Sequence, residues 1–532
     1  MANSKYEYVK QFEVEDEIMY PNFIVVRIDG HHFKRFSEVH EFEKPNDERG
    51  LKLMNACAVA VLEEYPDVIC SYGYSNEYSF VFKRSTKFYQ RRASKVMTLV
   101  VSYFTSTYIT KWKEFFTHDL CYAPSFCGHI IQCATVEVLQ TYLAWRQNDC
   151  HTNNLFNTCL YMLIKSGKTD AMAQTVMKDT RKQEKNELLF QQFGINYKKL
   201  PEIFRQGSFI MKGKVNEIVK YSENSSPIRR SRRKVVAVHS ENLIATSFWN
   251  SHSTLVEELG SFAKLNEKFK SGFIRSFQYE NNLMLSTWIV VRIDGCHFHR
   301  FSEVHGFEKP NDAQALNLMN SCAVAVLNEF PDIIFAYGVS DEYSFVLSKD
   351  SQMCQRLSSG IMSVIVSTFS SNYVTQWKDF FQNNELKYPP SFDGRSVCYP
   401  TSKILRDYLT WRQVDCHINN QYNTCFWMLV KSGMSKSEAQ NYLKGTQTRE
   451  KNDLLLHQFD IEYMSLPVMF RQGSSIYRLD KTNGCPTKVV VNHCNIIDDS
   501  FWEAHSYILK RDSDINSYTS ANDYGTQSFT DC

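Results

Sequence analysis

Hydrophobic residues recur along this chain in runs that predict short buried strands and longer helices. Trp288–Gly295 reads WIVVRIDG, and a continuous apolar run of this length is typical of a strand buried on both faces. Phe335–Phe345 reads FAYGVSDEYSF, in which a small-residue turn separates two runs rich in aromatic residues, so it predicts a β-hairpin. Leu51–Tyr65 has helical period and good helix formers.

The whole pattern occurs twice. Phe23–Asp47 and Trp288–Asp312 are identical at 21 of 25 aligned positions, at an offset of 265 residues. The offset becomes 266 at Trp145 and Trp411, and the correspondence continues to an RQGS turn in both copies. Because this period is too long for a solenoid, each copy is expected to be a domain of its own.

The chain length of 532 residues fits two such domains, each with a full core. We expect residues 1–22 to be a helical lead-in with core contacts from Tyr6, Phe12 and Ile18. The expected divisions are repeat 1 in 1–250, a linker in 251–265, repeat 2 in 266–510 and a disordered tail in 511–532.

Each copy orders its elements as strand, helix, strand, strand, helix, strand, followed by a helical second half. This order predicts an α+β, ferredoxin-like fold, with the segment that leads to Asp47 as strand or loop. Its central strands would bring Asp29 next to Asn76, and Asp294 next to Asp341. Two strand-end carboxylates suit a two-metal phosphoryl-transfer site, although such aspartates are also common turn caps.

Composition narrows the class of protein. The chain is 43% hydrophobic, carries a formal net charge of +2 and has no apolar run long enough to cross a bilayer, so no membrane partner is expected. The polar N-terminus with acids close behind predicts neither a signal peptide nor a transit peptide. Sixteen cysteines without C-x-x-C pairs indicate reduced thiols in an intracellular protein. The basic stretch Arg229–Lys234 reads as a nuclear-localisation signal, an RNA patch or a solvated loop.

Six motifs in order identify a resemblance. The sequence contains RIDG, F-x-KPND, YG-x-SDEYSF, SFDGR, WRQ-x-D-x-HINN-x-YNT and a late KN. It resembles the tRNA(His) guanylyltransferases over both copies, and a two-copy chain is typical of their plant members. The resemblance implies a polymerase-like palm built on the ferredoxin-like core. It also implies addition of a guanylate to the 5′ end of tRNA(His), in which ATP activates the 5′-phosphate and the GTP 3′-hydroxyl attacks it.

The resemblance also implies roles for individual residues. Asp294 and Asp341 are the implied catalytic residues and hold two Mg²⁺ ions with the Gly295 carbonyl, whereas Asp29, Gly30 and the weaker ligand Asn76 are their counterparts in repeat 1. The residues implied to bind nucleotide are Gly30, His31, His32, Phe33, Lys34, Lys44, Ser75, Gly295, Cys296, His297, Phe298, His299, Lys309 and Ser340. In repeat 2, residues 295–299 would face the triphosphate with their backbone N–H groups.

A further set is implied to handle RNA or phosphate: Arg92, Lys95, Asp393, Arg395, Asp415, His417, Asn420 and Lys451. Several have structural alternatives. His417 could be a hydrogen-bonded structural histidine, Lys451 a solvated helix lysine, and Trp411 and Tyr422 are expected in the core.

The two copies depart from the family pattern in complementary ways. Repeat 1 has Asn76 in place of the second metal aspartate, and Cys127 and His129 in place of the Asp and Arg of SFDGR. Repeat 2 keeps the carboxylates, but the RRASK of repeat 1 aligns with RLSSG. We therefore expect repeat 1 to be a degenerate scaffold that binds RNA, and repeat 2 to carry the chemistry.

Two further expectations rest on analogy. A two-repeat chain would form a homodimer that mimics the tetramer of single-copy relatives. Localisation would be nuclear, with a cytoplasmic fraction as the alternative. Two other functions remain open at this point, a catalytically weakened RNA-binding or assembly paralogue and an enzyme that repairs 5′-truncated RNA.

Overall fold

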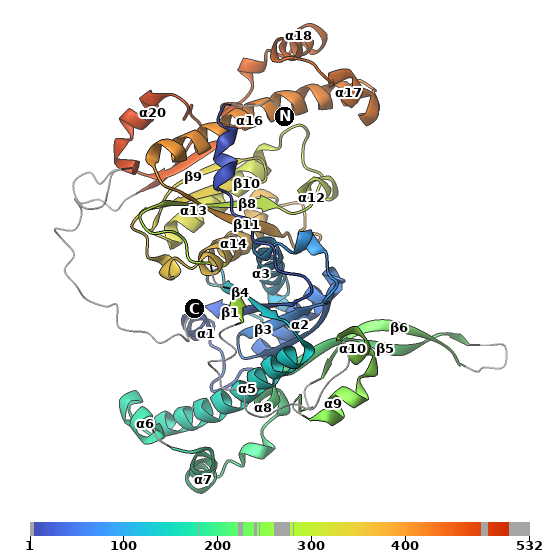
Figure 1. Ribbon diagram of the computed structural model, residues 1–532, viewed down its shortest axis with the longest axis vertical. Coiled ribbons are helices and arrows are strands. Elements are labelled where there is room, and N and C mark those ends of the chain that lie inside the picture. The colour runs from blue at the N-terminus through green and yellow to red at the C-terminus, as the bar shows by residue number, and fades with distance from the viewer. Residues whose placement is uncertain are drawn as a thin grey trace. The chain divides into compact units, whose positions relative to one another are not determined.

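A computed structural model describes residues 5–178, 180–221, 227–238, 242–243, 245–259, 277–279, 281–479 and 488–509 (Figure 1). The chain divides into two compact units. One unit joins the residues up to Glu15 to those from Asn281 on, and the other comprises Asp16–Glu280. Each unit is thus one repeat whose leading segment comes from the other repeat.

The unit of repeat 2 is built on a six-stranded sheet in the order β11-β8-β10-β9-β12-β13. The first four strands have the βαββαβ order and antiparallel register of a ferredoxin-like fold, which confirms the predicted α+β class. The strands are β8 (Trp288–Gly295), β9 (Ile333–Val339), β10 (Glu342–Leu347), β11 (Phe392–Tyr399), β12 (Ser474–Arg478) and β13 (Val489–Asn492).

Helices cover both faces of this sheet, which explains the continuous apolar run of β8. Trp288 and Val290 pack with Leu405 and Leu409 of α16, whereas the buried Ile289 alternates to the face that carries α13 and α14. The helices are α12 (Phe298–Val304), α13 (Ala313–Glu329), α14 (Ser358–Thr375), α15 (Trp377–Phe380), α16 (Ser402–Lys431), α17 (Lys436–Leu443), α18 (Thr448–Phe459), α19 (Val468–Gln472) and α20 (Asp499–Ala504), with 3-10 turns η4 (Met353–Arg356), η5 (Tyr463–Ser465) and η6 (Ser506–Leu509).

The unit of repeat 1 repeats this plan in a seven-stranded sheet of order β6-β5-β2-β3-β1-β4-β7. Its strands are β1 (Phe23–His31), β2 (Val68–Tyr74), β3 (Glu77–Phe82), β4 (Ser125–Cys133), β5 (Ser208–Tyr221), β6 (Pro227–Val238) and β7 (Gln278–Tyr279). Its helices are α1 (Phe33–Val39), α2 (Glu48–Glu64), α3 (Ala93–Thr110), α4 (Trp112–Phe115), α5 (Val136–Lys165), α6 (Asp170–Met177), α7 (Lys182–Phe193), α8 (Glu202–Gln206), α9 (Thr246–Ser251) and α10 (Ser253–Leu259), with 3-10 turns η2 (Phe88–Arg91) and η3 (Tyr197–Lys199).

Several local expectations differ from the structure. The lead-in forms only a 3-10 helix, η1 (Glu7–Phe12), and a helix, α1, occupies much of the segment expected to be strand or loop before Asp47. The basic stretch Arg229–Lys234 lies within β6, which pairs with β5, so it is not a loop.

The linker expected at 251–265 is wrong over its first part. Residues 253–259 form α10, because Leu255 and Leu259 are buried in the core of this unit. Residues 260–265 and the tail 511–532 lie outside the described residues.

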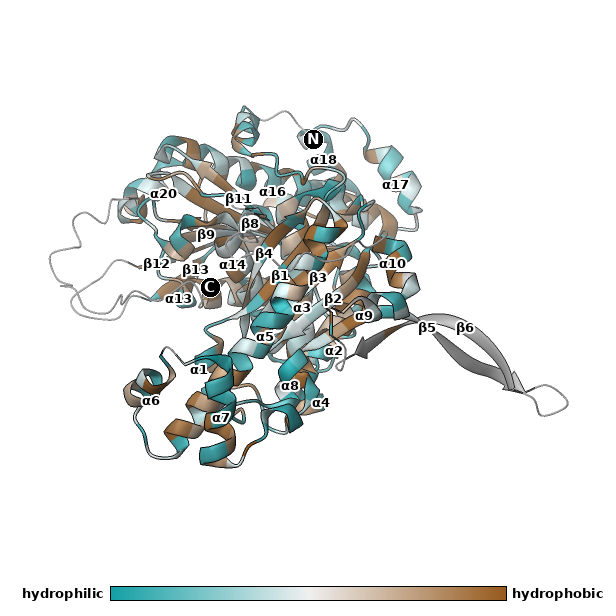
Figure 2. Ribbon diagram, turned by 60° about the horizontal axis from the view of Figure 1, so that its bottom comes forward, coloured by the Kyte–Doolittle hydropathy of each residue, from teal (hydrophilic) through white to brown (hydrophobic). Residues whose placement is uncertain are grey.

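Hydrophobic residues concentrate on the sheets in Figure 2, and the outer helix α17 is largely hydrophilic. In the described part of the chain, no helix combines the length and apolar character that crossing a bilayer requires.

Candidate active site

The β9–β10 hairpin and the end of β8 bring the predicted metal aspartates together. Asp341 lies in the turn between β9 and β10, after Ser340, whose φ is +55°. The Gly295 N–H donates to the carbonyl oxygen of Asp341 at 3.1 Å, and Asp294 stands opposite Glu342 in the register of β8 and β10. The expected proximity of Asp294 and Asp341 is confirmed by these pairings.

Asp294 lies among like charges. Burial and, after it, the carboxylates of Asp341, Glu342 and Asp393 together raise the pKa of Asp294 to about 7, against the opposing effect of Arg292. Burial also raises the pKa of Asp341. No ion pair to Asp294 or Asp341 occurs among the described residues. Clustered carboxylates of this kind are stabilised by a bound cation.

Side chains alone do not complete a metal site here. Across the ranges that the structure describes, no three His, Cys, Asp or Glu side chains form a metal-binding group. Mg²⁺, however, is commonly held by one or two carboxylates together with substrate phosphates and water. The carboxylates of Asp294 and Asp341 fit that pattern, because Asp341 lines a pocket that can hold a ligand and Asp294 directly precedes Gly295, whose N–H donates to Asp341.

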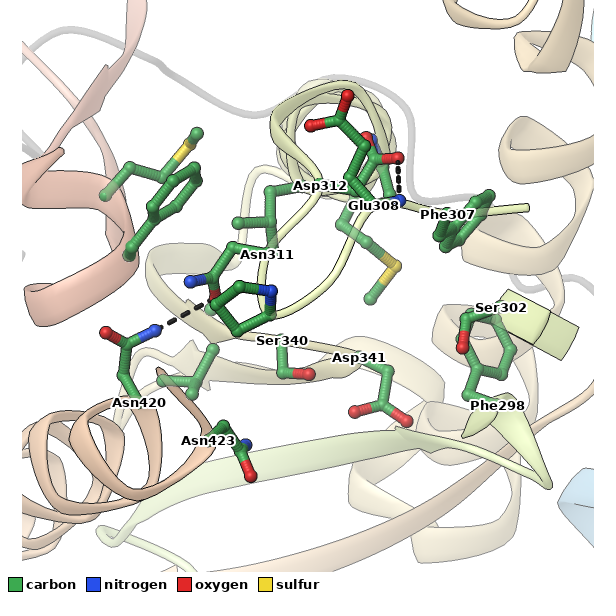
Figure 3. Close-up of a pocket in the computed structure, with 18 of the residues that line it drawn as sticks. Phe298, Ser302, Phe307, Glu308, Asn311, Asp312, Ser340, Asp341, Asn420 and Asn423 are labelled. Carbon is green, nitrogen blue, oxygen red and sulfur yellow. Dashed lines mark hydrogen bonds between the residues drawn. The ribbon is translucent and has the colours of Figure 1, made fainter. Parts of the chain in front are cut away.

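This pocket has a volume of about 350 Å³, within the range of small-molecule sites. In Figure 3, Ser340 and Asp341 approach it from the β9–β10 turn, and Asn420 and Asn423 approach it from α16. Six of the predicted site residues line it: Phe298, His299, Lys309, Ser340, Asp341 and Asn420.

Lys309 provides positive charge in the pocket. Its Nζ donates to Ser302 Oγ at 2.5 Å and lies 5.9 Å from the centroid of the Trp427 ring. Burial lowers the pKa of Lys309. A partly desolvated ammonium group in a nucleotide-sized pocket is well placed to pair with phosphate.

The sequence motifs did not predict some of the residues that line the pocket. Asn311 accepts a hydrogen bond from Asn420 at 2.9 Å, and Asn423 and Trp427 follow Asn420 on one face of α16. The spacing of Asn420, Asn423 and Trp427 by three and four residues was the available signal.

Gly295 is required by close packing at the start of α12. A Cβ on Gly295 would lie 2.4 Å from the Phe298 ring. The expectation that all N–H groups of 295–299 face a triphosphate does not hold for the first two. Gly295 donates to Asp341, and Cys296 donates to the carbonyl oxygen of Ser391 at 2.9 Å, while His297 and His299 are exposed.

Three arginines accompany the carboxylates of repeat 2. Arg412 pairs with Glu342 at 2.7 Å and with Asp415 at 3.2 Å, and Arg292 lies 3.8 Å from Glu342. The third, Arg395, pairs with Glu13 of the leading segment, as Arg292 also does. Sequence reasoning assigned no role to Glu13 or Glu342.

The other residues predicted to handle RNA lie apart from the pocket lining. Lys451 Nζ donates to the carbonyl oxygen of Thr446 at 2.6 Å, and the corresponding Lys185 contacts Thr180 at 2.7 Å. The half-buried ring of His417 meets Tyr463 edge-on at 5.2 Å, and burial lowers the pKa of His417. These contacts are those of structural anchors.

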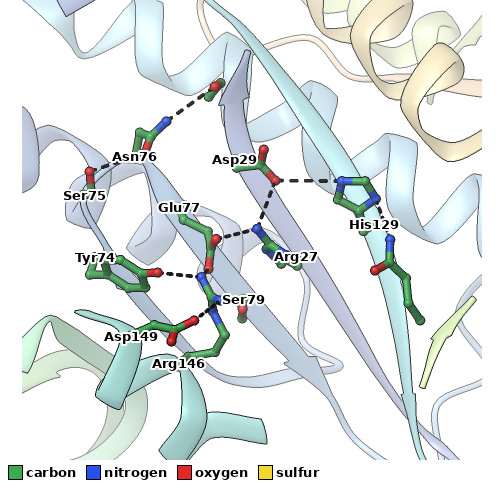
Figure 4. A network of polar contacts seen from close by, with 12 residues as sticks. Arg27, Asp29, Tyr74, Ser75, Asn76, Glu77, Ser79, His129, Arg146 and Asp149 are labelled. Carbon is green, nitrogen blue, oxygen red and sulfur yellow. Dashed lines mark hydrogen bonds and ion pairs between the residues drawn. The ribbon is translucent and has the colours of Figure 1, made fainter. Parts of the chain in front are cut away.

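In repeat 1 the carboxylates at the corresponding positions form ion pairs with basic side chains of the same repeat (Figure 4). Arg27 lies 3.8 Å from Asp29 and 2.7 Å from Glu77, and His129 Nε2 lies 3.9 Å from Asp29. Arg146 also pairs with Glu77. The carboxylate at Asp29 is thereby surrounded by basic groups of the protein.

Asn76 also differs from its aspartate counterpart in what it contacts. Its Nδ2 donates to the carbonyl oxygen of Gly30 at 3.4 Å, and its Oδ1 accepts from Ser75 at 3.3 Å. Gly30 contributes the carbonyl that was expected to bind metal, so the amide of Asn76 occupies that acceptor. Asn76 therefore contributes a donor where a metal site needs an acceptor.

The remaining predicted residues of repeat 1 have partners within the protein. His31 Nδ1 lies 3.2 Å from Ser125 Oγ, and burial lowers the pKa of His31 to about 4. The other contacts are His32 against His31, Phe33 against Phe36, Lys44 with Glu38, Arg92 with Asp16 and Lys95 above Tyr89, whereas Lys34 is exposed.

Comparison with known proteins covers both repeats. The family model described as tRNAHis guanylyltransferase matches residues 6–134 and 271–400. The model of the Thg1 C terminal domain matches residues 137–246 and 403–495. The paired matches reproduce the duplication seen in the sequence.

Two Arabidopsis thaliana proteins align over nearly the whole chain. tRNA(His) guanylyltransferase 1 is 65% identical and covers 96% of this chain and 91% of that protein. tRNA(His) guanylyltransferase 2 is 62% identical and covers 96% of this chain and 99% of that protein. The crystal structure of the Saccharomyces cerevisiae enzyme of this name is 42% identical, with a TM-score of 0.38, and covers 39% of this chain and 93% of that one.

Proposed function

This chain belongs to the tRNA(His) guanylyltransferase family, and we propose that the site at Asp294 and Asp341 adds a guanylate to the 5′ end of tRNA(His). The observation that carries the assignment to repeat 2 is the contrast between two carboxylate sites. Among the residues that the structure describes, none forms an ion pair with Asp294 or Asp341, and Asp341 lines the pocket that contains Lys309. In repeat 1, Asp29 is paired with Arg27 and His129.

The pocket residues would bind and orient the nucleotide. Lys309 would pair with phosphate oxygens, and the Ser340 hydroxyl and the amides of Asn420 and Asn423 would fix the substrate by hydrogen bonds. In the reaction of this family, ATP activates the RNA 5′-phosphate as an adenylate with release of pyrophosphate. The GTP 3′-hydroxyl then attacks the activated phosphate and displaces AMP, and pyrophosphate is removed from the added nucleotide at the end. Positioning and charge neutralisation provide most of the acceleration in phosphoryl and nucleotidyl transfer.

Asp294, Asp341 and the Gly295 carbonyl would hold two Mg²⁺ ions. When bound, these ions would activate the attacking hydroxyl and neutralise charge on the phosphates. The fit rests on the repulsion among the carboxylates around Asp294, which a divalent cation relieves.

Repeat 1 would act as a scaffold and RNA-binding partner. Its Asn76 donates to Gly30, and the buried thiol of Cys127 replaces the carboxylate of Asp393. These substitutions remove negative charge from the site, which weakens any attraction for a divalent ion.

The test is addition of labelled GMP to 5′-monophosphorylated tRNA(His) in the presence of ATP, GTP and Mg²⁺. We expect a product one nucleotide longer at its 5′ end, and no product when ATP or Mg²⁺ is omitted. Binding of tRNA without addition would instead support a non-catalytic paralogue. Preferred templated addition to a 5′-truncated tRNA would support a repair enzyme.

Two further features belong to this proposal. The chain would assemble as a homodimer of two-repeat subunits. Light scattering tests this by measuring the molar mass in solution. Nuclear localisation would rest on the basic strand residues Arg229–Lys234. A fluorescent fusion that lacks residues 228–234 and remains nuclear would refute that role.

A further inference from the structure

The two repeats exchange their leading segments. In the unit of repeat 2, Val9 of η1 is fully buried, the Phe12 ring meets Tyr399 edge-on at 5.6 Å, and the Tyr8 hydroxyl donates to Asp407 at 2.5 Å. In return, Gln278 and Tyr279, which stand 265 residues after Glu13 and Val14, extend the sheet of repeat 1 along β4.

The exchange brings Glu13 to the acidic site of repeat 2. Glu13 Oε1 accepts from Arg292 Nη1 at 3.4 Å, and its other oxygen pairs with Arg395. The three side chains are about four-fifths buried, with exposures of 20%, 19% and 18%. Charge pairs that are buried to this degree hold their partners more firmly than exposed ones do.

The same two arginines stand next to the metal aspartates. Arg292 precedes Asp294 by two residues on β8, and Arg395 follows Asp393 by two on β11. The register pairs Arg292 with Arg395 and Asp294 with Asp393. Because residues two apart share a face of a strand, both arginines can reach the aspartate pair unless another acid holds them.

Repeat 1 shows the arrangement that arises without that acid. The counterpart of Glu13 is Gln278, whose amide lies 3.2 Å from His129 Nδ1. Arg27, the counterpart of Arg292, pairs with Glu77 at 2.7 Å and also lies 3.8 Å from Asp29. With a neutral residue at the exchanged position, Arg27 and His129 therefore both lie within 4 Å of Asp29, His129 at 3.9 Å.

We propose that Glu13 is a positioning residue of the repeat 2 site, which it reaches through the segment exchange. By pairing with Arg292 and Arg395, it keeps these cations away from Asp294 and Asp393. The leading segment of repeat 1 thereby contributes a side chain that positions the charged residues of the repeat 2 site. This inference rests on the proposed function, because it concerns the Mg²⁺ that the site would bind.

The test measures binding of Mg²⁺ alone to the full-length chain by calorimetry. Glu13→Gln keeps the shape of the side chain and removes its charge, so both arginines become free to pair with the aspartates. We expect Mg²⁺ affinity to fall by about 10- to 100-fold, as for other residues that orient metal ligands. The matched control is Glu7→Gln, because Glu7 lies in the same segment and pairs at the surface with Lys10 at 2.7 Å. It should bind Mg²⁺ like the wild type.

A second substitution that restores Mg²⁺ binding would show that Glu13 acts by positioning the arginines and not by packing. In Glu13→Gln/Arg395→Gln, one of the two released arginines is removed together with the acid, so Mg²⁺ affinity should recover most of the loss. If the double variant binds as weakly as Glu13→Gln, or if Glu13→Gln binds like the wild type, the proposal is wrong. Should Glu13→Gln fail to fold, wild-type affinity in the double variant supports the proposal, and weak binding there refutes it.

The same titration distinguishes this inference from the proposed function. Wild type that binds no Mg²⁺, or binds it equally well after Asp294→Asn, would contradict the metal site itself. Wild-type binding that depends on Asp294 but not on Glu13 would contradict only the role of the exchanged segment.

Discussion

The side-chain amide of Asn76 donates a hydrogen bond to the carbonyl oxygen of Gly30 at 3.4 Å. The corresponding pair in repeat 2 is Asp341 and Gly295, in which an acid replaces the amide. One substitution therefore replaces a carboxylate, which accepts hydrogen bonds, with an amide that donates one to the backbone carbonyl of the same site. The basic groups around Asp29 add to the effect, since Arg27 and His129 both lie within 4 Å of it.

Restoring the acid in repeat 1 should not restore activity. In an Asp294→Asn background, which disables the repeat 2 site, Asn76→Asp should give no measurable guanylate addition, because Arg27 still pairs with Asp29 and His129 still lies 3.9 Å from it. The measurement is single-turnover addition to 5′-monophosphorylated tRNA(His). Activity rescued by Asn76→Asp would show that the amide alone had silenced repeat 1.

Lys309→Gln should weaken GTP binding by about 10- to 100-fold, the loss expected when a charge-assisted bond to phosphate is removed. The matched control is Lys44→Gln, because Lys44 is the repeat 1 counterpart and pairs with Glu38 at 3.2 Å on an exposed surface. Equilibrium binding of GTP compares the two variants. Equal losses from both would mean that the nucleotide is shared between the repeats or bound elsewhere.

The pH dependence of Mg²⁺ stabilisation follows from Asp294. Because its pKa is raised from 3.8 to about 7, the folded unit without cation loses stability as pH rises through this range. A cation competes with the bound proton, so Mg²⁺ should raise the Tm more at pH 8 than at pH 6. Thermal unfolding with and without Mg²⁺ at both pH values measures the difference. In Asp294→Asn the difference should disappear, and a larger shift at pH 6 would be inconsistent with this reading.

Arg412→Gln should destabilise the unit of repeat 2 by about 3 kcal/mol, because it leaves the largely buried Glu342 without its 2.7 Å partner. Lys378→Gln is the control, since Lys378 and Glu385 form an exposed pair at 4.0 Å and should contribute less than about 1 kcal/mol. Denaturant unfolding gives both values. A loss from Arg412→Gln no larger than that from the control would remove the structural role of this ion pair.

The duplication made much of this architecture predictable. Two copies of RIDG and of the Tyr-Gly hairpin indicated the strand order, and that order placed Asp294 beside Asp341. The pocket residues Lys309, Ser340 and Asn420 came from matched motifs. Local patterns of this kind are readable because short-range chemistry determines turns and strand ends.

The segment exchange could not be predicted in the same way. Glu13 lies 279 residues before Arg292, and its own repeat offers the similar Arg27 much closer in the sequence. The two repeats offer nearly identical surfaces to a leading segment. Tertiary packing determines which of them it joins, and here Val9 is buried against repeat 2. Likewise, the sequence predicted a linker where α10 lies. The contacts that stabilise α10 come from the core of repeat 1, which the local sequence does not reveal.

The most direct test of the central claim compares Asp341→Ala and Asp29→Ala in full-length protein, by single-turnover guanylate addition to 5′-monophosphorylated tRNA(His). If repeat 2 carries the chemistry, Asp341→Ala abolishes addition while Asp29→Ala retains it. Addition that survives Asp341→Ala and is lost in Asp29→Ala would contradict the account.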